Sequence, residues 1–132
     1  MVVGIGIDII EIERIKRSIE KFGDQFLNKI FTESEIKYCS EKKNQYQHFA
    51  ARFAAKEAII KTLSSVRTEP ANWKDMEIYN ESGGLPKVKL HNDLAVYVEN
   101  GRELKITMSH SENYVTCFAI LFNTLETLKI DE

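Results

Sequence analysis

The sequence predicts an α+β fold in which a mostly antiparallel sheet packs against one long, alanine-rich helix. The chain opens with an apolar, β-branched segment, continues through a helix-forming run rich in alanine, and ends in short β-type segments separated by turns. Strands and helices do not alternate regularly along the chain. This order favours an antiparallel sheet over a parallel α/β fold.

Length and composition indicate one globular domain. The chain has 132 residues, of which 43% are hydrophobic and 29% are charged, and this length suits a single core. No repeat or linker divides the sequence, so we expect one domain over residues 1–132. No apolar run approaches the ~20 residues that a membrane helix needs, so we expect no membrane association.

Charge and cysteine content restrict the classes of partner and compartment. Eighteen basic and 20 acidic residues give a net charge of −2, which argues against nucleic-acid binding. An anionic partner would need a local cluster of basic side chains. The N-terminus lacks the basic flank of a secretory signal. Cys39 and Cys117 are therefore expected to be reduced thiols in a cytoplasmic protein.

The first predicted element is a buried strand over residues 2–10. Gly4 and Gly6 leave one face of this strand bare, which predicts that a helix or another backbone packs closely there. Residues 11–30 have apolar side chains at helical spacing, with a break predicted at Gly23.

Two helices are predicted next. Thr32 and Glu35 have the spacing of a capping box that opens a helix ending at Cys39, and residues 40–47 are expected to form a loop or a frayed helix end. The longest helix covers residues 48–63, with many alanines that let neighbouring elements approach closely.

The second half of the chain is predicted to be mainly β structure. Strands are expected at residues 75–80, 85–90, 104–109 and 114–122, with a hairpin turn at 81–84 and a polar turn at 110–113. Between them, Asn92 is expected to cap a short helix through Val98.

Asp8 is unusual because a carboxylate in an apolar strand costs several kcal/mol unless it is paired. Asp8 either lies at the strand end and caps the next helix, or meets another group. A dinucleotide-binding loop is disfavoured because the third glycine is missing. The phosphate-binding strand of actin-like ATPases, a second alternative, continues with Gly-Thr where this chain has Ile9-Ile10.

Glu57 precedes Lys61 by four residues, so the two side chains share a helix face. They could form a surface ion pair worth roughly 0.3–0.5 kcal/mol. Alternatively, the helix packs on the glycine-bearing strand and Glu57 meets Asp8. Two carboxylates repel unless a proton or cation lies between them, and Mg²⁺ with a bound phosphate suits such a pair.

Other polar groups have both a simple and a functional interpretation. The turn Ser109-His110-Ser111 is either solvated or binds a phosphate, and the basic stripe Arg14, Arg17 and Lys21 is either solvated or a docking site for an acidic protein. Zinc is disfavoured, because His48 and His91 lack ligand spacing; both are expected to be structural or exposed.

Several segments together resemble the holo-[acyl-carrier-protein] synthase family, the short bacterial type of 4′-phosphopantetheinyl transferase. These segments, which span nearly the whole chain, are Gly4-Ile5-Gly6-Ile7-Asp8-Ile9, Glu11-Ile12-Glu13-Arg14-Ile15, Phe31-Thr32-Glu33-Ser34-Glu35 with Cys39, Arg52-Phe53-Ala54-Ala55-Lys56-Glu57-Ala58 with Lys61, Trp73-Lys74-Asp75-Met76-Glu77-Ile78, Gly84-Leu85-Pro86 and Ser109-His110-Ser111. One departure is residues 62–70, which lack the glycines usual there.

The resemblance implies transfer of 4′-phosphopantetheine from coenzyme A to a serine of apo-acyl carrier protein, in support of fatty acid biosynthesis. By resemblance, Asp8 and Glu57 bind Mg²⁺, Lys61 contacts the phosphate, and either Glu57 or a water accepts the serine proton. Arg52, Ser109 and His110 hold the nucleotide, while Arg14 and Lys21 contact the acidic carrier protein. The family also implies a homotrimer with active sites shared between subunits.

Two alternatives stay open at this point. A trimeric scaffold that binds an acidic protein would explain the basic stripe but leaves Asp8 without a role. A small nucleotide hydrolase would use Asp8 and Glu57 with Mg²⁺ but needs no carrier protein.

Overall fold

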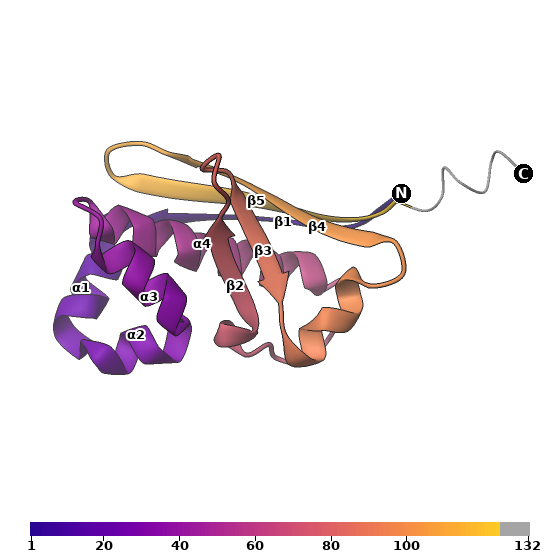
Figure 1. The fold of residues 1–132 in the computed structure, drawn as a ribbon, viewed down its shortest axis with the longest axis horizontal. Helices are drawn as coiled ribbons and strands as arrows, with labels where there is room; N and C mark the ends of the chain where they lie inside the picture. Colours follow the sequence, from indigo (N-terminus) through magenta and orange to yellow (C-terminus); the bar gives the residue numbers. More distant parts are fainter. Residues whose placement is uncertain (125–132) are drawn as a thin grey trace, which may run out of the picture.

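The computed structural model describes residues 1–124; residues 125–132 lie outside the described part. It confirms the α+β class. Strands β1 (Val2–Glu11), β5 (Tyr114–Asn123) and β4 (Arg102–His110) form an antiparallel sheet in that order. Figure 1 shows this sheet as one layer, with helix α4 (Gln45–Leu63) running beneath it.

The glycine face of β1 packs directly on α4, as predicted. A Cβ atom on Gly6 would overlap the carbonyl oxygen of Ala58, and one on Gly4 would overlap that of Thr62. The predicted burial of the whole strand is wrong for its other face. Alternate side chains of a strand point to opposite faces, and on the face away from α4 Ile5, Ile7 and Ile9 are 61%, 61% and 66% exposed.

Three short helices follow β1 and gather at one end of α4 (Figure 1). They are α1 (Ile12–Phe22), α2 (Asp24–Ile30) and α3 (Glu33–Ser40). The break at Gly23 is confirmed, since this residue has a φ of 55°, a value that favours glycine. The capping box is also confirmed, with reciprocal bonds between Thr32 and Glu35.

The predicted loop at residues 40–47 is too long. Helix α3 includes Ser40 and α4 already begins at Gln45. The amides of Gln47 and His48 donate to the carbonyl oxygen of Asn44, so this polar segment forms the first turn of a helix. Its polarity reflects solvent exposure, which does not by itself exclude helix.

The remaining strands form a separate hairpin. Strands β2 (Met76–Asn80) and β3 (Pro86–Leu90) pair antiparallel and cross α4 (Figure 1). Before them lies the short helix η1 (Trp73–Asp75), and after them the helix η2 (Asn92–Val98).

Two boundaries differ from the expectation. Asn92 does not cap η2: the N-cap is His91, Asn92 has a φ of 53°, and its side-chain amide donates to Asp75. Strand β4 continues through His110, so the turn covers only residues 111–113. The ladder pairing of His110 with Val115 extends the strand over this polar end.

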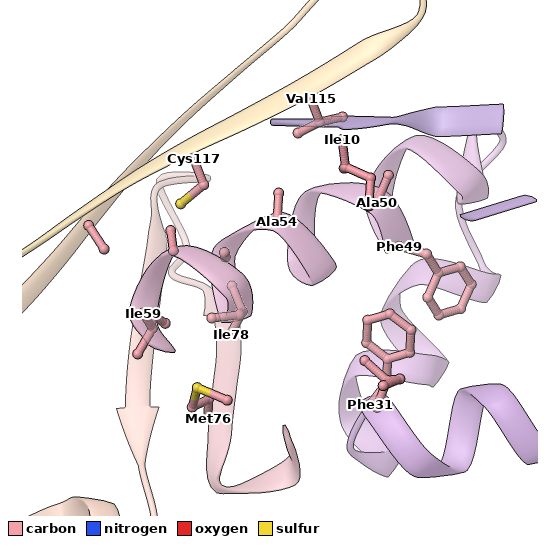
Figure 2. Close-up of a cluster of buried hydrophobic side chains, with 14 of the residues drawn as sticks. Ile10, Phe31, Phe49, Ala50, Ala54, Ile59, Met76, Ile78, Val115 and Cys117 are labelled. Atoms are coloured by element: carbon pink, nitrogen blue, oxygen red, sulfur yellow. The ribbon is translucent and has the colours of Figure 1, made fainter. Parts of the chain in front are cut away.

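One hydrophobic core connects these elements in the described part of the chain. In Figure 2, Ala50 and Ala54 of α4 face Ile10, Val115 and Cys117 of the sheet, while Ile59 lies near Met76 and Ile78 of β2. Small side chains on α4 let it approach the sheet, and the larger ones fill the space toward the hairpin.

Helix α4 also carries a fully buried lysine that the sequence pattern did not indicate. Lys56 Nζ donates to Glu35 Oε1 (2.7 Å) and to the carbonyl oxygens of Ile30 and Trp73 (2.8 and 3.1 Å). Glu35 accepts further bonds from the amides of Thr32 and Ile78. Burial lowers the pKa of Lys56, and the Glu35 carboxylate opposes this change.

Candidate functional site

Asp8 lies within β1 and not at its end. It does not cap α1, whose N-cap position is Glu11. The Asp8 side chain is 16% exposed and accepts a hydrogen bond of 3.2 Å from Lys61 Nζ. Lys61 also donates to the carbonyl oxygen of Ile7 (2.9 Å), which holds the ammonium group against the strand.

Glu57 lies one turn before Lys61 on α4 and is partly buried. Partial burial and the negative charge of Asp8 raise the pKa of Glu57, while the positive charges of Lys61 and Arg14 act in the opposite direction. The structure therefore brings together Asp8 and Glu57 from distant parts of the sequence. Both partners considered for Glu57, Lys61 and Asp8, are near enough to act on its pKa.

Asp8 and Glu57 are the two residues that could hold a metal ion at this place. Among residues 1–124, no group of three or more His, Cys, Asp or Glu side chains is placed to hold a metal ion. Asp8 and Glu57 supply only oxygen ligands. Mg²⁺ characteristically binds one or two carboxylates and completes its shell with waters and substrate phosphates, so two acids are a sufficient protein contribution.

A second cluster lies on the hairpin side of α4. A pocket of about 300 Å³ opens between α4, the β2–β3 hairpin and the end of β4. It is lined by Arg52 and His48 from α4, by Asn80, Gly84, Leu85 and Pro86 from the hairpin, and by Thr107, Met108, Ser109 and His110 from β4, among others. The three residues predicted to hold a nucleotide, Arg52, Ser109 and His110, thus share one pocket.

Arg52 is held rigidly in this pocket. It is only 3% exposed, its Nη2 donates to Asn80 Oδ1 (2.8 Å), and its guanidinium carbon lies 4.3 Å from the centre of the Tyr38 ring. Its buried Nε–H meets no acceptor, and no carboxylate of residues 1–124 pairs with it. A buried cation without an anionic partner is costly, which favours an anionic ligand here.

His48 was expected to be structural or exposed, but it lines the same pocket. Its pKa is lowered by partial burial and by the charges of Arg52, Lys42 and His110. The direction of this pKa shift reflects partial burial and the basic side chains Arg52, Lys42 and His110 near the imidazole ring of His48. The four-residue spacing of His48 and Arg52 places both on one helix face, and this spacing is the sequence signal for the shared pocket.

The two clusters lie on opposite edges of the sheet. Asp8 belongs to β1 and His110 to β4, and these are the two outer strands. The residues that line the pocket between α4, the hairpin and β4 do not include Asp8, Glu57 or Lys61. Within residues 1–124, Asp8, Glu57 and Lys61 therefore lie outside the pocket around Arg52.

Two surface features accompany these clusters. Arg14, Arg17 and Lys21 are all exposed on α1, and Arg14 is close enough to lower the pKa of Glu57. On the outer face of the sheet, Phe118 of β5 is 36% exposed and adds to the exposed isoleucines of β1. Within residues 1–124, no helix combines the length and apolarity needed to cross a bilayer.

Comparisons with known proteins place these features in context. A family model for the 4′-phosphopantetheinyl transferase superfamily matches residues 4–119. The holo-[acyl-carrier-protein] synthase of Koribacter versatilis is 42% identical over 123 residues, which cover 92% of this chain and 98% of that protein.

The solved structures to which this chain is similar are also holo-[acyl-carrier-protein] synthases. The structure of holo-[acyl-carrier-protein] synthase from Neisseria meningitidis superposes with a TM-score of 0.80 and 29% identity, covering 93% of this chain and 100% of that one. The Helicobacter pylori synthase in complex with coenzyme A superposes with a TM-score of 0.76 and 27% identity, covering 89% and 99% of the two chains.

Proposed function

The chain belongs to the 4′-phosphopantetheinyl transferase superfamily, and we propose that it transfers 4′-phosphopantetheine from coenzyme A to a serine of apo-acyl carrier protein. The products are holo-acyl carrier protein and adenosine 3′,5′-bisphosphate. The observation that carries this proposal is the convergence of Asp8, Glu57 and Lys61 in a chain that matches the family over residues 4–119.

The reaction exchanges a phosphoanhydride bond of coenzyme A for a phosphoester bond to serine. The serine oxygen bonds to the phosphorus that carries pantetheine, the bond from that phosphorus to the bridging diphosphate oxygen breaks, and the serine loses its proton. Either Glu57 or a water molecule would accept this proton. Lys61, held against β1 by Ile7 and Asp8, would neutralise charge on the departing phosphate.

Asp8 and Glu57 would hold Mg²⁺. When bound, this ion supplies charge neutralisation for the diphosphate and orients it for displacement. The two carboxylates repel one another in its absence, and the pKa of Glu57 is raised by burial first and by this repulsion second. The donor set therefore fits a hard divalent cation.

Arg52, Ser109 and His110 would bind the nucleotide of coenzyme A in the pocket beside the hairpin. The buried Arg52 without a carboxylate partner supports an anionic ligand, and the 3′-phosphate is the anion of coenzyme A that lies beside the adenosine. Arg14 and Lys21 would bind the acidic carrier protein, since both are exposed on the helix that follows the Asp8 strand.

We also propose a homotrimer in which each active site joins the acid pair of one subunit to the basic pocket of its neighbour. The opposite positions of the two clusters support this arrangement. The exposed Ile5, Ile7 and Ile9 ridge supports contact with another copy, because contiguous exposed apolar surface marks interaction sites. A cytoplasmic location and a role in fatty acid biosynthesis belong to the same proposal.

Mass spectrometry of apo-acyl carrier protein incubated with coenzyme A and Mg²⁺ tests the transfer. We expect the carrier protein to gain one phosphopantetheine group. Binding without a mass change would favour the scaffold alternative, and cleavage of the nucleotide without a modified carrier protein would favour the hydrolase. The variant Asp8→Ala should abolish transfer while keeping the fold.

Subunit complementation tests the shared active site. Asp8→Ala and Arg52→Ala subunits, each inactive alone, should regain activity when they are unfolded and refolded together, because mixed trimers contain intact composite sites. Mixtures that stay inactive although mixed trimers form would contradict sharing.

A further inference from the structure

The side chain of Asn80 joins the buried cation of the nucleotide pocket to the loop that forms the pocket wall. Its Oδ1 accepts from Arg52 Nη2 (2.8 Å), and its Nδ2 donates to the carbonyl oxygen of Gly84 (3.0 Å). These two bonds fix the amide orientation, since a flipped amide would place donor against donor and acceptor against acceptor.

The loop that Asn80 holds is otherwise weakly anchored. It is closed by backbone bonds from Glu81 to Leu85 and from Gly84 to Glu81, and its residues 81–85 are exposed. Gly84, with a φ of 83°, leads into Leu85 and Pro86, and all three line the pocket. Asn80 is the side chain that connects this loop to α4.

Arg52 depends on the same contact for its position. Its guanidinium carbon lies 4.3 Å from the centre of the Tyr38 ring, a contact that directs none of its N–H groups, whereas the Asn80 bond directs Nη2. No carboxylate of the described residues competes for the charge. A neutral amide partner therefore positions Arg52 without cancelling its charge, as an acid would.

We propose that Asn80 is a positioning residue for recognition of the 3′-phosphate of coenzyme A, acting through Arg52 and the 81–85 loop. This inference rests on the proposed function. It predicts that the chain distinguishes coenzyme A from 3′-dephospho-coenzyme A, and that the distinction depends on Asn80.

The test measures the affinities of both nucleotides by calorimetry for the wild type and for Asn80→Ala. We expect the variant to lose about tenfold or more in affinity for coenzyme A, the value of a hydrogen bond to a charged group, while its affinity for 3′-dephospho-coenzyme A changes little. Ser82→Ala, in the same exposed loop, is the matched control and should behave like the wild type.

A second variant separates positioning from folding. Asn80→Asp keeps an acceptor for Arg52 but neutralises its charge and loses the bond to Gly84, so it too should lose affinity for coenzyme A while its affinity for the 3′-dephospho form changes little. Equal losses for both nucleotides in both variants, or a wild type that binds both equally, would overturn the inference. Failure of the wild type to modify the carrier protein would instead overturn the proposed function.

Discussion

Lys56 of α4 and Glu35 of α3 form an ion pair with an Nζ–Oε1 distance of 2.7 Å, and both side chains are excluded from solvent. All three donors of the ammonium group are used, by Glu35, Ile30 and Trp73. The pair therefore connects the helical end of the molecule to the helix that carries Glu57, the next residue along the chain.

Replacing Lys56 with methionine tests this connection. The change leaves the Glu35 carboxylate buried without its cation, and removing one partner of a buried pair costs about 3–5 kcal/mol. Urea unfolding monitored by circular dichroism should show this loss. Lys37→Met, at an exposed position of α3, serves as the control, and an equally small effect of both changes would contradict the structural role of the pair.

Gly6→Ala tests the contact between β1 and α4. The added methyl group would meet the Ala58 carbonyl oxygen and the backbone of Thr62, and a backbone contact of this kind is not relieved by a change of rotamer. We expect a loss of ~1–3 kcal/mol, the range for overpacked cores, together with reduced transfer because Asp8 would move away from Glu57.

The matched control is Gly83→Ala in the exposed hairpin loop. Nothing lies within 4 Å of a Cβ atom at that position, and its φ is not in the left-handed region. Thermal unfolding should leave this variant close to the wild type. If Gly6→Ala is as stable as Gly83→Ala, the close approach of helix and strand is not required.

These elements differ in how far the sequence could predict them. The packing of α4 on β1 was predictable from Gly4 and Gly6, because only glycine lacks the Cβ that would prevent it. The approach of Glu57 to Asp8 followed once that packing was assumed. Both inferences need only the spacing of residues along β1 and α4 and the single contact between these two elements.

Other features depend on contacts that local spacing does not encode. Glu35 fits a capping box and also neutralises Lys56, 21 residues away, and only the first role has a sequence signature. Arg52 meets Asn80 across 28 residues. The exposed face of β1 carries isoleucines like those of a core strand, so the sequence pattern does not distinguish its two faces in burial.

The pKa of Glu57 predicts a pH dependence of Mg²⁺ binding. In the metal-free protein its folded-state pKa lies above the ordinary value, through burial and Asp8. A proton bound to Glu57 competes with the cation, so Mg²⁺ affinity should rise with pH through this pKa and then level off. Calorimetric titration with Mg²⁺ at a series of pH values measures this.

The same argument predicts the effect of Asp8→Asn. Loss of the Asp8 charge should lower the pKa of Glu57, observable by carbon NMR of its carboxyl group, and should weaken Mg²⁺ binding by removing a ligand. Asp24→Asn, on the exposed start of α2, should change neither quantity. A Glu57 pKa unaltered by Asp8→Asn would show that burial alone accounts for the shift.

Arg14→Glu tests the docking of an acidic carrier protein on α1. Arg14 is exposed and near the acid pair, so charge reversal should weaken the encounter with an acidic partner much more than the binding of coenzyme A. We expect KM for the carrier protein to rise roughly tenfold, equivalent to about 1.4 kcal/mol. Added salt should reduce the difference, because exposed charges are screened.

Steady-state kinetics with each substrate varied in turn measures both KM values. Lys29→Glu, at an exposed position of α2, makes the same change in net charge away from the stripe and should leave both values near wild type. Equal increases in the two KM values for Arg14→Glu, or an equal effect of Lys29→Glu, would remove the docking role from α1.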